Sequence, residues 1–158
     1  MEIVVRTMGI QKMVNLDYLA GFCDGEGCFT IVKHTHKQGE RRYFEYKPTV
    51  VVSNTNRKIL ERFKKTFKAG SIQVANYGRI SNRRWKQTWN WVLVNKQATN
   101  FCSTMLNKLI LKKEQAMILI KLQTTRSTRG KKTRFCVLNR QKKMLEQIRK
   151  LNKSGREV

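Results

Sequence analysis

The chain has 158 residues, of which 34 are lysine or arginine and 10 are aspartate or glutamate, so its formal net charge is +24. Hydrophobic residues make up 40% of the sequence, which excludes intrinsic disorder, and the length fits one domain with a real core. A folded chain with this charge repels itself unless it has a polyanionic partner. Nucleic acid is the partner that the charge indicates.

The sequence offers no segment that predicts a membrane span, and its first residues lack the pattern of a signal peptide. The four cysteines form neither a C-x-x-C pair nor a zinc-type cluster with histidine. We therefore expect reduced thiols in an intracellular protein, in the cytoplasm of a prokaryote or archaeon or in an organelle. The cysteines are Cys23, Cys28, Cys102 and Cys136.

The first predicted elements are a helix and a hairpin. Asn15 can cap a helix whose apolar positions repeat at helical spacing from Leu16 to Cys23, before glycines end it. Alternating residues then predict strands over 28–37 and 41–53, joined by a turn at 39–40. In the first strand, Phe29 and Ile31 alternate with more polar side chains.

The second half of the chain repeats the helix and hairpin and then turns helical. Three tryptophans, Trp85, Trp89 and Trp91, share the apolar face of the last strand, so we expect them in the core rather than stacked on bases. Antiparallel hairpins with helices on one face make an α+β domain and leave the other sheet face open to a partner. The predicted elements are a helix over 57–67, strands over 71–77 and 84–94, helices over 96–111, 114–122 and 139–151, and a basic loop over 124–132.

The division of the chain follows from these elements. Residues 1–14 are expected to be an N-terminal extension, and residues 15–123 to be the core. Residues 124–158 are expected to be a basic loop and helix of the same domain, tracking phosphates at the flanks of a nucleic acid. The apolar stripe of this last helix, which includes Ile148, must pack on the core.

Residues 19–27 read Leu-Ala-Gly-Phe-Cys-Asp-Gly-Glu-Gly and occur once. Ala20 and the pair Gly21 and Gly25 are expected to expose bare backbone along one helix face, so that a partner helix can approach closely. If the partner is the same helix of a second copy, a two-fold axis brings the two Glu26 carboxylates together. Such paired anions call for divalent cations shared with DNA phosphates, an arrangement suited to phosphodiester hydrolysis. The plainer alternative is a glycine-rich helix end with a solvated acid.

This run resembles the signature of the LAGLIDADG homing endonuclease family. Phe22 and Cys23 replace two apolar residues, Gly25 replaces a small residue, and Glu26 replaces the final acid. The order of elements extends the resemblance over most of the chain, from about residue 16 to 122. It implies an αββαββα-type domain with a saddle-shaped antiparallel sheet and helices packed on one face. The residues at the family's positions are Leu19, Ala20, Gly21, Asp24 and Gly27.

The resemblance also implies a catalytic set and an interface. Glu26 would be the catalytic acid and would hold the metal together with Gly25. The supporting positions look like Ser53, Arg57 and Lys112, although the family often has Gln at the first of them, so Asn54 is an alternative. Asp24 is expected to bond local backbone or a partner helix. The implied dimer interface comprises Leu19, Ala20, Gly21, Asp24 and Gly25.

Base recognition is expected on the open faces of the two hairpins, because a β-ribbon fits the major groove. His34 and His36 could chelate a metal, but no third ligand is apparent, so DNA contact is the expectation. Ser71 and Tyr77 are further candidates, and Lys143 in the tail is a candidate for phosphate contact. The predicted DNA-binding residues are Cys28, Thr30, Val32, His34, His36, Arg41, Arg42, Gln73, Arg83, Arg84, Lys86, Thr88, Asn90, Lys131 and Lys132.

These observations predict a homodimeric, site-specific DNA endonuclease, because one motif supplies one acid per chain. It would cleave both strands of a long, roughly palindromic duplex with Mg²⁺ or another divalent metal such as Mn²⁺. A chain of this length without a splicing domain suggests intron encoding. Two alternatives of another class remain: an RNA maturase that helps an intron to splice, and a non-cleaving DNA- or RNA-binding protein of the same fold.

Overall fold

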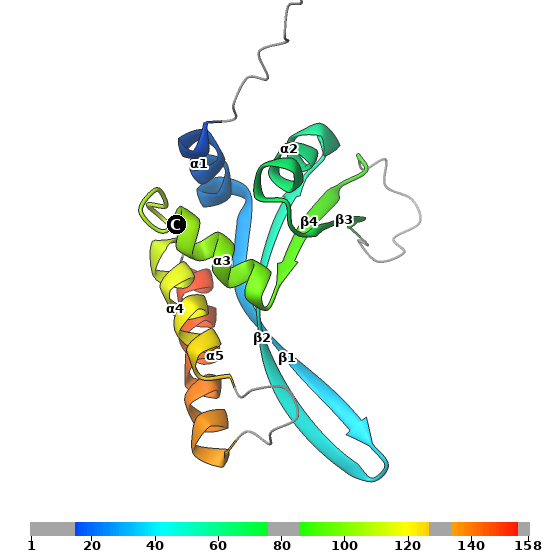
Figure 1. Ribbon diagram of the computed structural model, residues 1–158, viewed down its shortest axis with the longest axis vertical. Helices are drawn as coiled ribbons and strands as arrows, with labels where there is room; N and C mark the ends of the chain where they lie inside the picture. The colour runs from blue at the N-terminus through cyan, green and yellow to red at the C-terminus, as the bar shows by residue number, and fades with distance from the viewer. Residues whose placement is uncertain (1–14, 76–85, 127–133, 155–158) are drawn as a thin grey trace, which may run out of the picture.

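The computed structural model describes residues 15–75, 86–126 and 134–154. The helices and strands follow one another in the predicted order, which confirms the α+β class. Figure 1 shows the helices gathered against one side of a long, twisted pair of strands. The elements are α1 (Leu16–Glu26), β1 (Gly27–Gln38), β2 (Arg41–Asn54), α2 (Arg57–Phe67), β3 (Ser71–Val74), β4 (Trp89–Val94), α3 (Lys96–Met105), α4 (Lys113–Thr124) and α5 (Phe135–Ser154).

The four strands form one antiparallel sheet in the order β1-β2-β4-β3. The β1–β2 ladder runs from the pair Gly27–Val52 to the turn at residues 39–40. β4 pairs with β2 only over residues 49–54, so the rest of the β2 edge has no third strand in the described structure. Figure 1 shows the far end of the β1–β2 ribbon diverging from α4 and α5.

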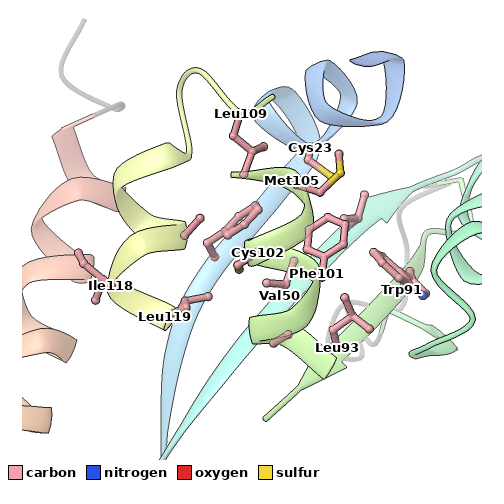
Figure 2. Packing of buried hydrophobic residues seen from close by; sticks show 14 of the residues in the cluster. Cys23, Val50, Trp91, Leu93, Phe101, Cys102, Met105, Leu109, Ile118 and Leu119 are labelled. Carbon is pink, nitrogen blue, oxygen red and sulfur yellow. The ribbon is translucent and has the colours of Figure 1, made fainter. Parts of the chain in front are cut away.

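The core lies between the sheet and the helices. Phe29 and Ile31 of β1 are buried, as their alternation predicts, and so are Trp91 and Leu93 of β4. Trp91 lies among aromatic rings and donates from its indole Nε1 to the carbonyl oxygen of Ala69 at 3.0 Å. Figure 2 shows Trp91 and Leu93 of the sheet beside core side chains of the helices, among them Phe101 and Met105. The expectation of a core tryptophan is confirmed at Trp91.

The C-terminal helix α5 packs on α4 and β1. Its apolar stripe buries Leu145 and Ile148 completely or nearly so. Near its end, the side-chain amide of Asn152 donates to the carbonyl oxygen of Phe29 at 3.1 Å. The stripe therefore packs on the core, as predicted.

Several element boundaries differ from the prediction. β3 ends at Val74 and β4 begins at Trp89, so Lys86 and Thr88 precede the strand instead of lying in it. α3 ends at Met105, not residue 111: the amides of Lys108 and Leu109 still donate to the carbonyl oxygen of Met105, whereas those of Ile110 and Lys112 donate to the Asp24 carboxylate. α5 is longer than predicted, beginning at residue 135 and ending at 154.

The four thiols are free and fall into two classes. Cys23 and Cys102 are buried, and burial raises both pKa values, that of Cys102 to about 12. Cys28 and Cys136 are exposed. Among the described helices, none combines the length and apolar character needed to cross a membrane.

Candidate active site and nucleic-acid interface

Glu26 is the last residue of α1, and its side chain is exposed. The chain passes directly from this helix into β1 at Gly27. Because Gly27 lies opposite Val52, the antiparallel register puts Glu26 and Ser53 at the same end of the ribbon. The predicted acid and its first predicted supporting residue therefore share one end of the sheet.

The three glycines of the motif differ in what surrounds them. A Cβ atom at Gly27 would collide with the carbonyl oxygen of Cys23, so the turn from helix to strand requires glycine there. A Cβ atom at Gly21 or Gly25 would meet nothing within 4 Å. Glycine inside a helix costs roughly 0.5–1 kcal/mol relative to alanine. Packing within one chain therefore explains Gly27 and leaves the other two glycines unexplained.

Asp24 joins α1 to the segment before α4. Its two carboxylate oxygens accept hydrogen bonds from the backbone amides of Ile110 and Lys112, both at 2.9 Å. Lys112 is the N-cap residue of α4. The carboxylate thus holds the backbone of Lys112 at Asp24, which stands two residues before Glu26 in the sequence. These backbone partners lie 86 and 88 residues further along the chain, so they are not the local backbone that was one of the two roles predicted for Asp24.

A row of polar side chains crosses the sheet at the same end. Ser53 of β2 and Gln73 of β3 both pair with Asn90 of β4. The Ser53 hydroxyl donates to the Asn90 side-chain oxygen at 2.7 Å. The side-chain oxygen of Asn54 instead accepts the amide of Asn56 in the turn before α2. Ser53 is therefore the better placed of the two candidates.

Arg57 begins α2, and its side chain has two partners. Its Nε donates to Glu61 at 2.9 Å, and its guanidinium carbon lies 4.7 Å from the centre of the Trp89 ring. Trp89 is half-buried, and its contact with a cation was not anticipated from the sequence. A shallow cleft here is lined by Thr55, Asn56, Arg57, Lys58, Lys86, Gln87 and Trp89.

The sheet face opposite the helices, called the open face below, carries the predicted DNA-reading side chains of β1. Cys28, Val32 and His34 are exposed on it, and Thr30 and His36 are partly exposed. On β2, Glu45 accepts hydrogen bonds from His36 at 3.2 Å, Lys47 at 3.3 Å and Arg126. None of these contacts to Glu45 was predicted.

Partial burial acts to raise the pKa of Glu45, but hydrogen bonds from Lys47 and His36 and the charges of Lys47 and Arg126 outweigh it. The pKa therefore lies below its usual value. The carboxylate is ionised at neutral pH and is surrounded by cationic or donor groups.

Some predicted site residues lie in the core, and others lie outside the residues that the structure describes. Leu19 and Ala20 are buried in the chain's own core, because they fall on the inward side of α1. They therefore cannot contribute to an interface on its free side, and this part of the prediction is wrong. Residues outside the described structure are Tyr77, Arg83, Arg84, Trp85, Lys131 and Lys132, together with the side chain of Arg41.

A single chain offers few ligands for a metal ion at this site. Within the described segments, no three His, Cys, Asp or Glu side chains gather closely enough to hold an ion. At the end of α1 a single chain offers the Glu26 carboxylate and the neighbouring carbonyl groups. Oxygen donors of this kind suit Mg²⁺, but one carboxylate does not complete a site.

The comparison with protein families bears directly on this arrangement. A family model described as LAGLIDADG endonuclease matches residues 19–124. The chain belongs to the LAGLIDADG endonuclease family. The match begins in α1 with the nine-residue motif and ends in α4, so it includes every strand of the sheet. No curated protein sequence matched the chain.

Solved structures of LAGLIDADG proteins share the fold. The homing endonuclease I-CvuI in complex with the I-CreI target has 17% identity and a TM-score of 0.69, covering 86% of this chain and 80% of that one. The archaeal intron-encoded homing endonuclease I-Vdi141I complexed with DNA has 20% identity and a TM-score of 0.65, covering 86% and 82%. I-LtrWI bound to target DNA has 15% identity and a TM-score of 0.67, covering 86% and 44%.

Proposed function

We propose that this chain is a homodimeric, site-specific homing endonuclease that cleaves both strands of a long, roughly palindromic DNA duplex, and that it is intron-encoded. The observation that carries the proposal is the exposed Glu26 at the end of a helix whose free side holds two glycines without neighbours. Membership of the LAGLIDADG endonuclease family supports the reaction class. The DNA complexes of structural neighbours support the substrate class.

A second copy accounts for the unexplained glycines. Gly21 and Gly25 lie on the same side of α1 as the exposed side chain of Tyr18, because these positions are three and four residues apart. Packing of this side against its own two-fold copy lets the two backbones approach closely. The two Glu26 carboxylates then meet at the interface, and each chain contributes half of one catalytic centre.

The proposed centre would hold a divalent cation between the Glu26 carboxylates of the two chains. Such an ion, when bound, supplies a water nucleophile and neutralises charge that develops at the phosphate. The part of this chain is to place Glu26 at the helix end, with Lys112 held beside it through Asp24. Lys112 and Arg57 add positive charge for the phosphate, and Ser53 adds a hydroxyl group close to the helix end.

The open face supplies a surface for the duplex. Its exposed polar and apolar side chains suit base edges in the major groove, and the net charge of +24 favours a polyanion. A ribbon of two strands can enter that groove. Binding and cleavage therefore use different parts of one sheet, because Glu26 lies at one end and the ribbon extends from it.

The test is selection of cleaved duplexes from a randomised DNA library, with Mg²⁺, Mn²⁺ or a chelator. We expect double-strand cuts at one sequence class, and none with the chelator. Glu26→Gln should bind the selected duplex within about threefold of the native affinity, because most of the affinity comes from phosphate contacts. It should lose about 10²–10³-fold in cleavage rate, a loss typical of a charge-stabilising group.

The matched control is Glu40→Gln, which removes the same charge at the far end of the ribbon. It should cleave at the native rate and bind DNA slightly more tightly, because it loses one negative charge. Cleavage by Glu26→Gln at the native rate would remove that residue from the centre. Specific binding of DNA or intron RNA by a native protein that cuts nothing would replace the proposal with the non-cleaving or maturase function.

A further inference from the structure

Glu45 is an acid on the face that the proposed function assigns to DNA. It lies on β2 opposite His34, and its neighbours along the same strand face are Tyr43 and Lys47. An uncompensated carboxylate on this surface would repel phosphate groups. Instead, three side chains from different parts of the chain donate to it, namely His36, Lys47 and Arg126.

Arg126 connects this carboxylate to the helical layer. It follows the C-cap of α4, and its side chain is only 17% exposed. The guanidinium donates from Nη2 to Glu45 and from Nη1 to the side-chain oxygen of Asn95 at 2.6 Å. Asn95 lies just after β4, with a left-handed φ of 54°, and its own amide donates to the carbonyl oxygen of Pro48. Arg126 therefore braces the edge of β2 where β4 ends.

Within this network of contacts, His36 is the side chain that faces the proposed DNA surface. Its ring bonds to Glu45 and stacks on Tyr43, with ring centres 4.8 Å apart and planes 10° apart. The His34 ring lies 5.0 Å away. A side chain held by one hydrogen bond and one stacked ring loses little further conformational freedom when it meets a base.

We propose that Glu45 is a specificity-determining positioning residue, which orients His36 and Lys47 on the DNA-reading face and braces that part of the ribbon against the helices through Arg126. The inference rests on the proposed DNA binding and adds to it. Glu45 itself does not read a base, because cationic and donor groups occupy its oxygens. His36 lies nine residues from Gly27 along β1, about 30 Å in a strand, so the affected bases are the outer ones of each half-site.

The experiment compares Glu45→Gln with Glu40→Gln, an exposed acid in the ribbon turn, on a library that varies each base pair of the selected target. Both variants lose one negative charge, so both should bind all sequences slightly more tightly. Only Glu45→Gln should lose discrimination, about tenfold, at two or three outer positions. Discrimination at the central positions should not change. Arg126→Lys, which keeps the charge but loses the planar fork, should relax the same outer positions.

A second readout requires no DNA. In the native protein, NMR should show slow rotation of the Arg126 guanidinium, held by Glu45 and Asn95, and Glu45→Gln should make it fast. Specific cleavage by the native protein with identical base profiles for the two glutamine variants would overturn the inference and leave the proposed function intact. A uniform loss at all positions with a lowered unfolding midpoint would also overturn it, since this would mean a role in stability alone. A native protein that binds no duplex specifically would instead end the proposed function.

Discussion

At the scale of single residues, Asp24 holds the proposed site together. One carboxylate accepts two backbone amides from the segment between α3 and α4. Hydrogen bonds to charged groups contribute roughly 1.5–3 kcal/mol, about twice as much as neutral ones. The motif therefore carries two acids with different functions: Glu26 is free to face a ligand, and Asp24 fixes the backbone of Lys112.

Asp24→Asn should loosen the segment from residue 106 to 112. An amide keeps only one acceptor oxygen, so one of the two backbone N–H groups of Ile110 and Lys112 loses its partner. We expect the free energy of unfolding to fall by about 1–3 kcal/mol, and hydrogen exchange to rise at these two amides.

Asp17→Asn is the control, because Asp17 also pairs with this segment, through an exposed ion pair with Lys108. That change should cost under about 1 kcal/mol. Equal protection of the Ile110 and Lys112 amides in native protein and Asp24→Asn would contradict the role given to this carboxylate.

The sequence predicted the residues whose position follows from a local pattern. The motif located Glu26, and strand alternation located the side chains of β1. Glu45 carried no signal, because its importance depends on Arg126, 81 residues later in the chain. Leu19 and Ala20 were misplaced because the motif shows which residues are small or apolar, while the side of the helix that faces the core depends on the sheet beneath it.

At the scale of elements, Gly70 governs the connection from α2 to β3. Its φ of +83° lies in the left-handed region, and a Cβ atom there would press into the Trp91 ring and the Leu93 side chain. Gly70→Ala should therefore lower the free energy of unfolding by about 2–4 kcal/mol, through strain and overpacking together. Urea unfolding followed by tryptophan fluorescence measures this change.

Gly39→Ala separates the two effects. Gly39 also has a positive φ, +60°, but a Cβ atom there would meet nothing within 4 Å. It should cost only about 1 kcal/mol, the conformational part alone. Equal losses for the two variants would show that contact with Trp91 contributes nothing.

Element order was predictable and element length was not. The helical stripe over 96–111 continued through Leu109, which is buried as that stripe requires. The helix nevertheless ends at Met105, and the amides of Ile110 and Lys112 donate to the Asp24 carboxylate instead of continuing a helix. A pattern of apolar residues reports burial, and a buried side chain can belong to a loop as well as to a helix.

At the scale of the whole molecule, the two glycines of α1 predict how copies associate. Gly21→Leu should turn the proposed dimer into monomers at micromolar concentration, because a large side chain separates the two helix backbones. The stability of one chain should not fall, since the position is open. Sedimentation equilibrium over a range of concentrations measures the association.

Gln147→Leu adds a similar apolar side chain at an exposed position of α5. It should leave the association unchanged. A Gly21→Leu protein that stays dimeric and cuts DNA would place the interface elsewhere.

Under the proposed function, the length of the β1–β2 ribbon sets how rare the DNA target is in a genome. The 12 residues of β1 span about 40 Å, which matches roughly twelve base pairs at about 3.4 Å each. Two copies then span about twenty or more base pairs, a sequence expected by chance once in on the order of 10¹² positions, whereas genomes offer about 10⁶–10⁹. Several base pairs of the target can therefore change without a second site arising elsewhere in the genome. A protein of this size could in this way select one site per genome.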